Sequence, residues 1–236
     1  MTVALVTGFS SGIGRAVAER FARDGARVIV NSSRSVEEGQ ALARELGGVY
    51  VAGDVAREED AKRLVATALE RFGRLDVVIN NAGTTKRIPF AELDAADDET
   101  WRRILGVNLL GAWYVSRAAV PALRESRGAI VNVGSVAGFV AGGSSLPYAV
   151  SKAALHHLTR CLAQALAPEV RVNAVAPGLV ETPWTAGWAA NDAIVARTPL
   201  ARAATPDDVA DAIVFLARNE FATGQIVVVD GGLTLT

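Results

Sequence analysis

The chain has 236 residues, a length that suits one domain with a substantial core. Its 24 basic and 25 acidic residues nearly cancel, so its charge does not point to nucleic acid or an anionic membrane as a partner. Its single cysteine, Cys161, cannot form an internal disulfide, and its place in an apolar helical pattern predicts small core filler. No stretch resembles a targeting peptide or a membrane span, so we expect a cytoplasmic protein.

Short apolar runs alternate with amphipathic stretches along the whole chain. The runs occupy residues 3–7, 27–31, 49–53, 75–80, 128–134, 170–176 and 225–230. Between them apolar residues recur at helical spacing, as in 37–47 and 58–73. The alternation predicts an α/β, doubly wound (Rossmann) fold: a seven-stranded parallel sheet with helices on both faces. Ligands of such sheets bind at the carboxyl ends of the strands.

A glycine-rich turn, GFSSGIG, follows the first apolar run and opens the first amphipathic stretch. Strand, glycine turn and helix together form the context in which such a motif indicates dinucleotide binding. Gly8 would permit the tight turn, and Gly12 would let backbone N–H groups approach a pyrophosphate. Gly14 would allow the helix to pack closely on the strand. By itself the motif is weak evidence, because an ordinary turn between a strand and a helix uses similar residues.

Tyr148 and Lys152 lie four residues apart, just after Pro147. On a helix this spacing places both side chains on one face. A nearby ammonium favours the phenolate, so the pair could move a proton to or from a substrate oxygen near neutral pH. Ser135 ends the apolar run AIVNVGS, where its hydroxyl could hold the same oxygen. These residues indicate the proton-transfer half of a carbonyl reductase or alcohol dehydrogenase.

Taken together, the motifs resemble the short-chain dehydrogenase/reductase family, in its compact single-domain branch. In chain order they are TGFSSGIG at 7–14, GDV at 53–55, NNAG at 80–83, Asn108, Ser135, Tyr148 with Lys152, PG at 177–178 and VDGG at 229–232. The resemblance implies one NAD(P)-binding domain over 1–236, with a short substrate lid at about 182–205. It also implies hydride transfer between nicotinamide and a carbonyl or secondary alcohol, with a small-molecule ketone or alcohol as the substrate.

The resemblance assigns roles to individual residues. Tyr148 becomes the general acid/base, and Lys152 binds the ribose hydroxyls and lowers the pKa of the phenol. Ser135 orients the substrate oxygen, and Asn108 holds a water in the proton relay to Lys152. Asn80 is expected near the adenosine, while Asn81 braces the central sheet. The full cofactor-binding set is Gly8, Ser10, Ser11, Gly12, Ile13, Gly14, Ser32, Ser33, Arg34, Asp54, Val55, Asn80, Ala82, Gly83, Tyr148, Lys152, Pro177, Gly178, Val180 and Thr182.

The substrate is the least determined part of the prediction. The expected pocket residues are Ser135, Gly138, Phe139, Val140, Leu146, Tyr148, Trp184 and Trp188. The two tryptophans either cover the substrate or pack the lid against its own domain or a neighbouring subunit. A sugar, a small ketone and a hydroxylated natural product all stay open, as does the direction of the reaction. No metal site is expected, because His156 and His157 point about 100° apart on a helix and have no acidic or cysteine partners at ligand spacing.

The cofactor preference rests on the end of the second apolar run, which reads Asn31, Ser32, Ser33, Arg34. NAD-dependent family members carry aspartate where Ser32 stands, whereas serines and an arginine suit a 2′-phosphate. NADP(H) is therefore favoured. Ser11 stands where many NADP-dependent relatives have a second basic residue, so dual use with NAD(H) stays open.

Two other interpretations use the same fold. One is a catalytically silent cofactor-binding sensor or scaffold, although such proteins usually lose the tyrosine or the lysine. The other is an epimerase or dehydratase, whose known examples tend to carry a second substrate domain. For assembly, the Tyr148 helix is rich in alanine, which lets helices approach closely, and family members usually pair this helix. We therefore expect a homotetramer with two-fold interfaces, and a dimer is the alternative.

Overall fold

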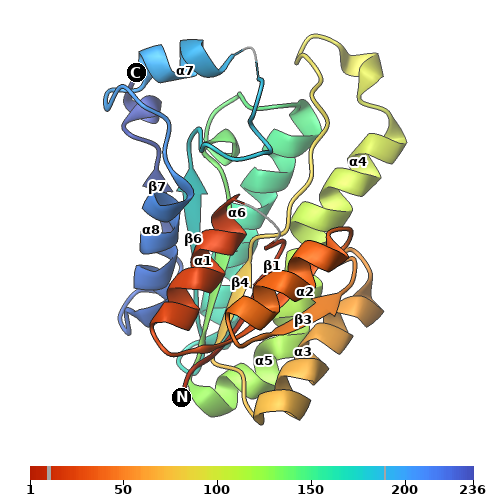
Figure 1. Ribbon diagram of the computed structural model, residues 1–236. Coiled ribbons are helices and arrows are strands. Elements are labelled where there is room, and N and C mark those ends of the chain that lie inside the picture. Colours follow the sequence, from red (N-terminus) through yellow and green to blue (C-terminus); the bar gives the residue numbers. More distant parts are fainter. Residues whose placement is uncertain (10–11, 189) are drawn as a thin grey trace.

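The computed structural model describes residues 1–9, 12–188 and 190–236, and its centre is one parallel sheet of seven strands (Figure 1). The strand order is β3-β2-β1-β4-β5-β6-β7, so the chain winds outward from β1 in both directions, as predicted. The strands are β1 (Val3–Thr7), β2 (Arg27–Ser32), β3 (Val49–Ala52), β4 (Val77–Asn80), β5 (Ala129–Val133), β6 (Arg171–Pro177) and β7 (Ile226–Val229).

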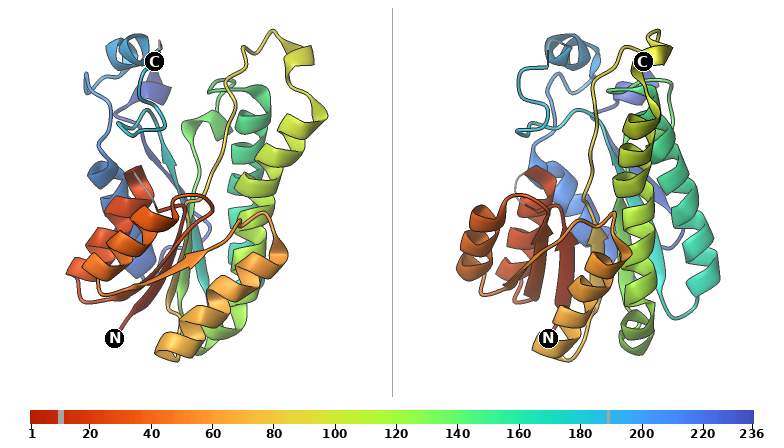
Figure 2. Two further views of the ribbon diagram at one scale, coloured as in Figure 1. Left: turned by 45° about the vertical axis from the view of Figure 1, so that its right-hand side comes forward. Right: turned by 90° about the vertical axis from the view of Figure 1, so that its right-hand side faces the viewer.

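Helices cover both faces of this sheet (Figure 2). One face packs against α1 (Gly12–Arg23), α2 (Val36–Glu45) and α8 (Pro206–Arg218). The other packs against α3 (Glu58–Phe72), α5 (Ala112–Ser126) and α6 (Leu146–Leu166). The remaining helices are α4 (Asp98–Leu105), joined to α5 by the π-helical turn η2 (Gly106–Gly111), and α7 (Asn191–Arg197) near the C-terminus.

The core lies in two layers, one on each side of the sheet, and β1 shows why its sequence is continuously apolar. Ala4 and Val6 point into the layer under α1 and α8, whereas Val3 and Leu5 point into the layer under α3 and α5. All four are fully buried, as expected for a parallel strand covered on both faces. Each layer also has a large anchor, such as Phe21 on α1, whose truncation to alanine would cost about 3–5 kcal/mol.

Cys161 contradicts one prediction, because it is exposed on α6 rather than part of the core. The buried side of this helix includes Leu155, Leu162 and Leu166, and Cys161 lies off it. The pattern misled because α6 carries apolar residues around much of its circumference, so helical spacing alone does not identify the inward face. Within the described residues, no helix is long and apolar enough to cross a membrane.

The fold brings the predicted motifs to one rim. The carboxyl ends of β1, β2, β4, β5 and β6 all contribute residues to one cavity of about 830 Å³. The lid segment 182–205, which includes α7, lies beside this cavity at the top of Figure 1. A parallel bridge between Val180 and Ala204 closes the lid at its base, with the Glu181 N–H donating to the Ala204 carbonyl at 2.8 Å.

Candidate active site

The glycine turn after β1 lies against the cavity, where only glycine fits. Gly8 and Gly12 have φ angles of +65° and +58°, which favour glycine. A Cβ at Gly8 would lie 2.5 Å from Ala82 Cα, and one at Gly12 would lie 2.7 Å from Thr182 Cγ2. Helix α1 begins at Gly12 and presents its free N–H groups and positive dipole end at this point. The cradle therefore fits a pyrophosphate.

The other predicted residues of this turn differ in their positions. Ile13 lines the cavity, but Gly14 does not. A Cβ at Gly14 would meet the Asn81 amide nitrogen at 2.5 Å and the Gly8 carbonyl at 2.6 Å, so this glycine allows close packing behind the turn. Ser10 and Ser11, which were also expected at the cofactor, lie outside the described residues.

Asn80 and Asn81 hold positions opposite to those expected. The Asn80 side chain is buried and does not line the cavity; its Nδ2 donates to Asn132 Oδ1 at 2.9 Å and Ser116 Oγ at 3.0 Å. Asn81 lines the cavity, and its Nδ2 donates to the Gly8 carbonyl at 2.6 Å. Successive side chains along a strand point to opposite faces, which explains the exchange. Asn80 thus braces the sheet, and Asn81 braces the glycine turn.

The corner of the cavity beyond β2 contains no carboxylate from that strand. Ser32, Ser33 and Arg34 all line the cavity. Ser32 is nearly buried, with its Oγ 3.0 Å from Tyr50 Oη and donating to the Ser35 carbonyl at 3.1 Å. Ser33 and Arg34 are exposed, so their polar groups can reach a ligand.

Asp54 lies at the same corner, and Arg103 of α4 pairs with it. Arg103 Nη1 donates to Asp54 Oδ2 at 2.7 Å, and both residues line the cavity. Burial acts to raise the pKa of Asp54, but the hydrogen bonds from Arg103 and the Ala56 N–H, with the charge of Arg34, bring that pKa below its usual value. The carboxylate therefore stays ionised beside two arginines. Arg103 was not predicted from the sequence.

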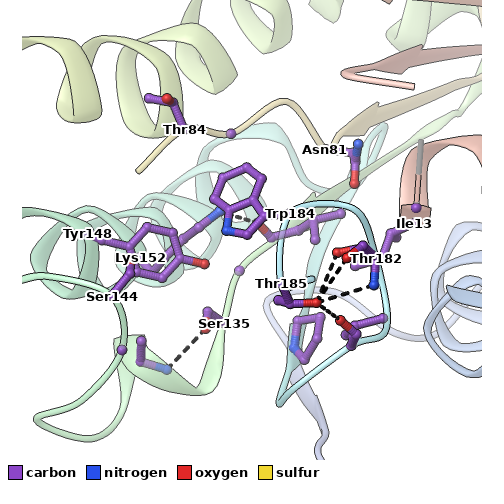
Figure 3. Close-up of a pocket in the computed structure, with 18 of the residues that line it drawn as sticks. Ile13, Asn81, Thr84, Ser135, Ser144, Tyr148, Lys152, Thr182, Trp184 and Thr185 are labelled. Atoms are coloured by element: carbon purple, nitrogen blue, oxygen red, sulfur yellow. Dashed lines mark hydrogen bonds between the residues drawn. The ribbon is translucent and has the colours of Figure 1, made fainter. Parts of the chain in front are cut away.

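Tyr148 and Lys152 share one face of α6, as their spacing predicted. The helix begins after Ser145, whose Oγ accepts from the Tyr148 N–H at 3.4 Å. The Lys152 ammonium lies 5.7 Å from the centroid of the Tyr148 ring and donates to the Val133 carbonyl at 2.8 Å. Ser135 follows β5 and caps the short turn η3 (Val136–Gly138), its Oγ accepting from the Ala137 N–H at 3.2 Å. All three line the inner part of the cavity (Figure 3).

The titration of this pair differs from the expectation. Burial raises the pKa of Tyr148, although the Ser135 hydroxyl acts in the opposite direction. Burial also lowers the pKa of Lys152 to about 8. Removing both groups from water disfavours the charged form of each. The phenol therefore keeps its proton through neutral pH.

Asn108 lies in the π-helical turn η2 and ties two walls of the site together. Its Oδ1 accepts from the Thr84 N–H at 2.8 Å, and its Nδ2 donates to the Thr84 carbonyl at 3.1 Å and to Ser151 Oγ at 2.9 Å. Ser151 in turn donates to the Tyr148 carbonyl at 2.7 Å. The side chain is buried and does not line the cavity, so it connects the loop after β4 to α6.

Comparison with known proteins decides the family. A protein-family model described as "Enoyl-(Acyl carrier protein) reductase" matches residues 8–234. The chain is 54% identical over 239 residues to "Granaticin polyketide synthase putative ketoacyl reductase 2" of Streptomyces violaceoruber, covering 99% of this chain and 96% of that one. It is 38% identical over 245 residues to the 3-oxoacyl-(acyl-carrier-protein) reductase FabG of Thermotoga maritima, covering 99% and 98%. The chain belongs to the short-chain dehydrogenase/reductase family.

A solved structure supports the same conclusion. The crystal structure of "Short-chain dehydrogenase/reductase SDR:Glucose/ribitol dehydrogenase" from Brucella melitensis has a TM-score of 0.92 to this chain at 35% identity. The match covers 98% of this chain and 96% of that one. The protein is therefore an enzyme of the short-chain dehydrogenase/reductase class, and the family fits the glycine cradle and the Tyr148–Lys152 pair already described.

On the substrate side of this short-chain dehydrogenase/reductase, the two lid tryptophans line the cavity. The Trp184 and Tyr148 ring centroids are 6.4 Å apart, and Figure 3 shows the indole beside that phenol ring. The Arg87 guanidinium lies over the Trp188 ring, 5.8 Å from its centroid. The tryptophans therefore face the cavity, and Trp188 also links the lid to the loop after β4.

Three residues expected at the substrate do not line the cavity: Gly138, Phe139 and Leu146. Phe139 is 48% exposed and packs on His156, with ring centroids 4.6 Å apart. The turn η3 directs it away from the site. Val140, which was expected at the substrate, does line the cavity. The rest of this wall includes Val136, Ala137, Gly143 and Ser144, which the expectation missed. Only the uncharged, glycine-rich character of 136–144 could have indicated a close-packed loop there.

Proposed function

We propose that the protein is a ketone reductase that prefers NADP(H) and uses Tyr148 as the general acid. The observation that carries this proposal is the convergence of three groups on one end of the cavity: the Tyr148 phenol, the Lys152 ammonium 5.7 Å from its ring, and Ser135. The bound dinucleotide would supply the hydride to the carbonyl carbon. The glycine cradle would hold the pyrophosphate of the dinucleotide. Separate cavity-lining residues, among them Ser32, Asp54 and Thr182, would hold the rest of the dinucleotide across the cavity.

The protein's own residues would handle the proton. As the carbonyl carbon gains the hydride, the carbonyl oxygen gains negative charge, which the Ser135 hydroxyl stabilises by donating a hydrogen bond. Tyr148 then gives its proton to that oxygen and becomes a phenolate, which the Lys152 ammonium stabilises. The raised pKa of Tyr148 keeps the phenol protonated near pH 7, so the proton that a reduction needs is already on the donor.

We assign Asn108 a positioning role. The hydrogens of its amide nitrogen are engaged with Thr84 and Ser151, and Ser151 bonds the backbone of Tyr148. The relay water expected from the family resemblance would therefore need an acceptor atom of Asn108 rather than its amide hydrogens. Through Ser151 the residue also holds the first turn of α6, and with it Tyr148, against the loop after β4.

The preference for NADP(H) is supported by the corner beyond β2. Ser33 and Arg34 are exposed there and can donate to a 2′-phosphate, and Arg34 does so with a charge-assisted hydrogen bond. The nearest carboxylates in the following sequence, Glu37 and Glu38, lie in the first turn of α2. NAD(H) would lack the contacts made by the 2′-phosphate but would keep the contacts with the rest of the cavity.

For the substrate class we propose a ketoacyl compound, such as an intermediate of polyketide assembly. This rests on the named relatives, a ketoacyl reductase and a 3-oxoacyl reductase. It is compatible with a cavity of about 830 Å³ whose lining includes Trp184, Trp188 and Val140, because aromatic and aliphatic walls suit an apolar acyl chain or ring. The retention of both Tyr148 and Lys152 argues against a catalytically silent sensor.

The test is a reductase assay that follows nicotinamide absorbance with NADPH. A panel of 3-ketoacyl thioesters, polycyclic aromatic ketones, simple ketones and sugars would define the substrate class. We expect the ketoacyl or polycyclic ketones to be reduced and Tyr148→Phe to abolish that signal. If neither class of ketone is reduced with NADPH, and a sugar is oxidised when NADP+ or NAD+ replaces NADPH, the proposed substrate is wrong. The assay decides this without affecting the family assignment.

We also propose a homotetramer. On one side Val150 of α6 and Leu110 of η2 are exposed, and on the edge strand β7 Val227 and Val228 are exposed. Two apolar surfaces on different sides of the molecule suit two sets of two-fold contacts. Light scattering should give a mass of about 98 kDa, four times the 24.6 kDa chain. A value near 49 kDa, the mass of a dimer, would mean that only one of the two interfaces forms. A monomer would contradict the proposal.

A further inference from the structure

His156 is buried directly behind the turn that carries Ser135. It lies on α6, four residues beyond Lys152, and is 2% exposed, whereas the adjacent His157 is exposed. Its ring touches the two glycines on either side of Ser135. A Cβ built on Gly134 would collide with the imidazole Nε2, and one built on Gly138 would lie 2.6 Å from its Cε1. The absence of side chains at these two positions makes room for the imidazole ring.

Hydrogen bonds within the turn and to its neighbours hold the turn in place, among them the bond from the Ala137 N–H to Ser135 Oγ. The Gly134 N–H donates to the Val175 carbonyl at 2.7 Å, and the Gly138 N–H donates to the Ser135 carbonyl at 2.9 Å. Lys152 Nζ holds the preceding residue, Val133, at 2.8 Å. On the side facing α6, the imidazole of His156 and the backbone of Lys152 lie against the turn.

Burial of the two ring nitrogens of His156 reduces the stability of the fold. Among the described residues, neither ring nitrogen has a hydrogen-bond partner. An unsatisfied buried polar group costs about 1–3 kcal/mol, so an aliphatic side chain would be better on stability alone. Burial, Lys152 and Arg160 lower the pKa of His156 to about 4, so the ring is neutral near pH 7. The contacting parts of β5 and η3 add no charged side chain.

We propose that His156 is a positioning residue, whose flat neutral ring fills the space between Gly134 and Gly138 and fixes the turn that aims the Ser135 hydroxyl. The proposal rests on the proposed role of Ser135 at the substrate oxygen. A smaller side chain would let the turn sink toward α6, and a substituent on Gly134 would push it outward. Either movement displaces Ser135 while leaving the glycine cradle of the cofactor unchanged.

The test compares turnover in four variants with the ketone identified by the reductase assay. His156→Ala should lower kcat about ten- to a hundredfold, because displacement of a catalytic group by about 1 Å can cost about 10²-fold. The cofactor KM should not change. His157→Ala is the matched control, on an exposed neighbour, and should behave as wild type. Gly134→Ala alone should also lower kcat, because its methyl collides with the ring.

The fourth variant, Gly134→Ala with His156→Ala, separates positioning from general destabilisation. Of the three heavy atoms nearest to a Cβ at Gly134, two belong to the imidazole and the third is Val175 O at 3.2 Å. The double variant should therefore be more active than Gly134→Ala alone, because the collision is removed. In a Ser135→Ala background, His156→Ala should have no further effect on kcat, since the residue acts through Ser135.

Wild-type turnover in folded His156→Ala, or a double variant no better than Gly134→Ala, would overturn the proposal. Should His156→Ala not fold, His156→Leu takes its place, and full activity in that variant would be equally decisive. Failure of the underlying function would look different. Ser135→Ala with undiminished activity would remove the role of Ser135, whatever the His156 variants do.

Discussion

Ser32→Asp should reverse the cofactor preference. The substitution places a carboxylate at the corner of the cavity beside Arg34, where the 2′-phosphate of NADP(H) is proposed to bind. Two unit charges about 4 Å apart repel by about 4 kcal/mol at the effective dielectric of a protein surface. A carboxylate would also accept a hydrogen bond from the ribose hydroxyl of NAD(H), worth about 1.5–3 kcal/mol.

Screening reduces these values, because Ser33 and Arg34 at the same corner are exposed to solvent. We therefore expect the ratio of kcat/KM for NADPH to that for NADH to fall by about 10²-fold, equivalent to about 3 kcal/mol. The new side chain can still accept from Tyr50 Oη, which lies 3.0 Å from Ser32 Oγ, but it also faces the Ser35 carbonyl. A loss of about 1 kcal/mol in stability should accompany the switch.

The assay measures kcat/KM for both cofactors with one ketone, in wild type, Ser32→Asp and Ser32→Ala. The alanine variant is the matched control, because it removes the hydroxyl without adding charge. It should weaken NADPH slightly and should not improve NADH. A wild-type enzyme that favours NADH, or an unchanged ratio in Ser32→Asp, would refute the placement of the phosphate at this corner.

Two further substitutions test other parts of the site. Arg103→Ala removes the partner of Asp54 and should raise the cofactor KM by up to about fivefold, since such partly exposed pairs contribute about 0.2–1 kcal/mol, whereas Arg102→Ala should leave it unchanged. His156→Leu should reduce the fall in the free energy of unfolding at acid pH. Burial lowers the pKa of His156 to about 4, so the unfolded chain binds that proton first and the wild-type free energy of unfolding falls as pH drops from about 6.5 to about 4. The measurement is the free energy of unfolding from chemical denaturation at several pH values between about 4 and 6.5. His157→Leu should lose stability with falling pH as the wild type does. The same pH dependence of stability in all three proteins would contradict the assignment.

The sequence predicted the fold because parallel strands covered on both faces are continuous apolar runs. Each of the seven runs became a strand whose ends lie within two residues of the prediction. The motif residues followed, since every one lies just after a strand or on the next helix. Tyr148 and Lys152 needed only helical spacing, and Gly8 and Gly12 only the turn that precedes α1.

The features that could not be predicted depend on which way a side chain points and on contacts between residues far apart in the sequence. Asn80 and Asn81 exchanged places because their roles depend on which of two successive side chains points to the cavity. His156 and His157 pose the same problem on a helix, where one is buried and the other exposed. The pair of Arg103 and Asp54 joins residues 49 positions apart, and local spacing carries no information about such a contact.

Desolvation also has no signature in the sequence. The spacing of Tyr148 and Lys152 indicated a lowered phenol pKa, but the depth at which both groups lie raises it instead. The phenol therefore rests in its protonated form, the form from which a general acid can donate. Burial of a titratable group follows from the packing of the whole domain, and it decides the chemistry as much as the residue type does.

The most direct test of the central claim is the turnover of Tyr148→Phe with NADPH and an accepted ketone. The substitution removes one oxygen and leaves the ring, its packing beside Trp184 and the glycine cradle in place. Turnover should fall about 10²–10⁴-fold, the contribution of general acid catalysis, while the dissociation constant of NADPH stays within about threefold of wild type. A variant that keeps more than about a tenth of the wild-type turnover would contradict the assignment of Tyr148 as the proton donor.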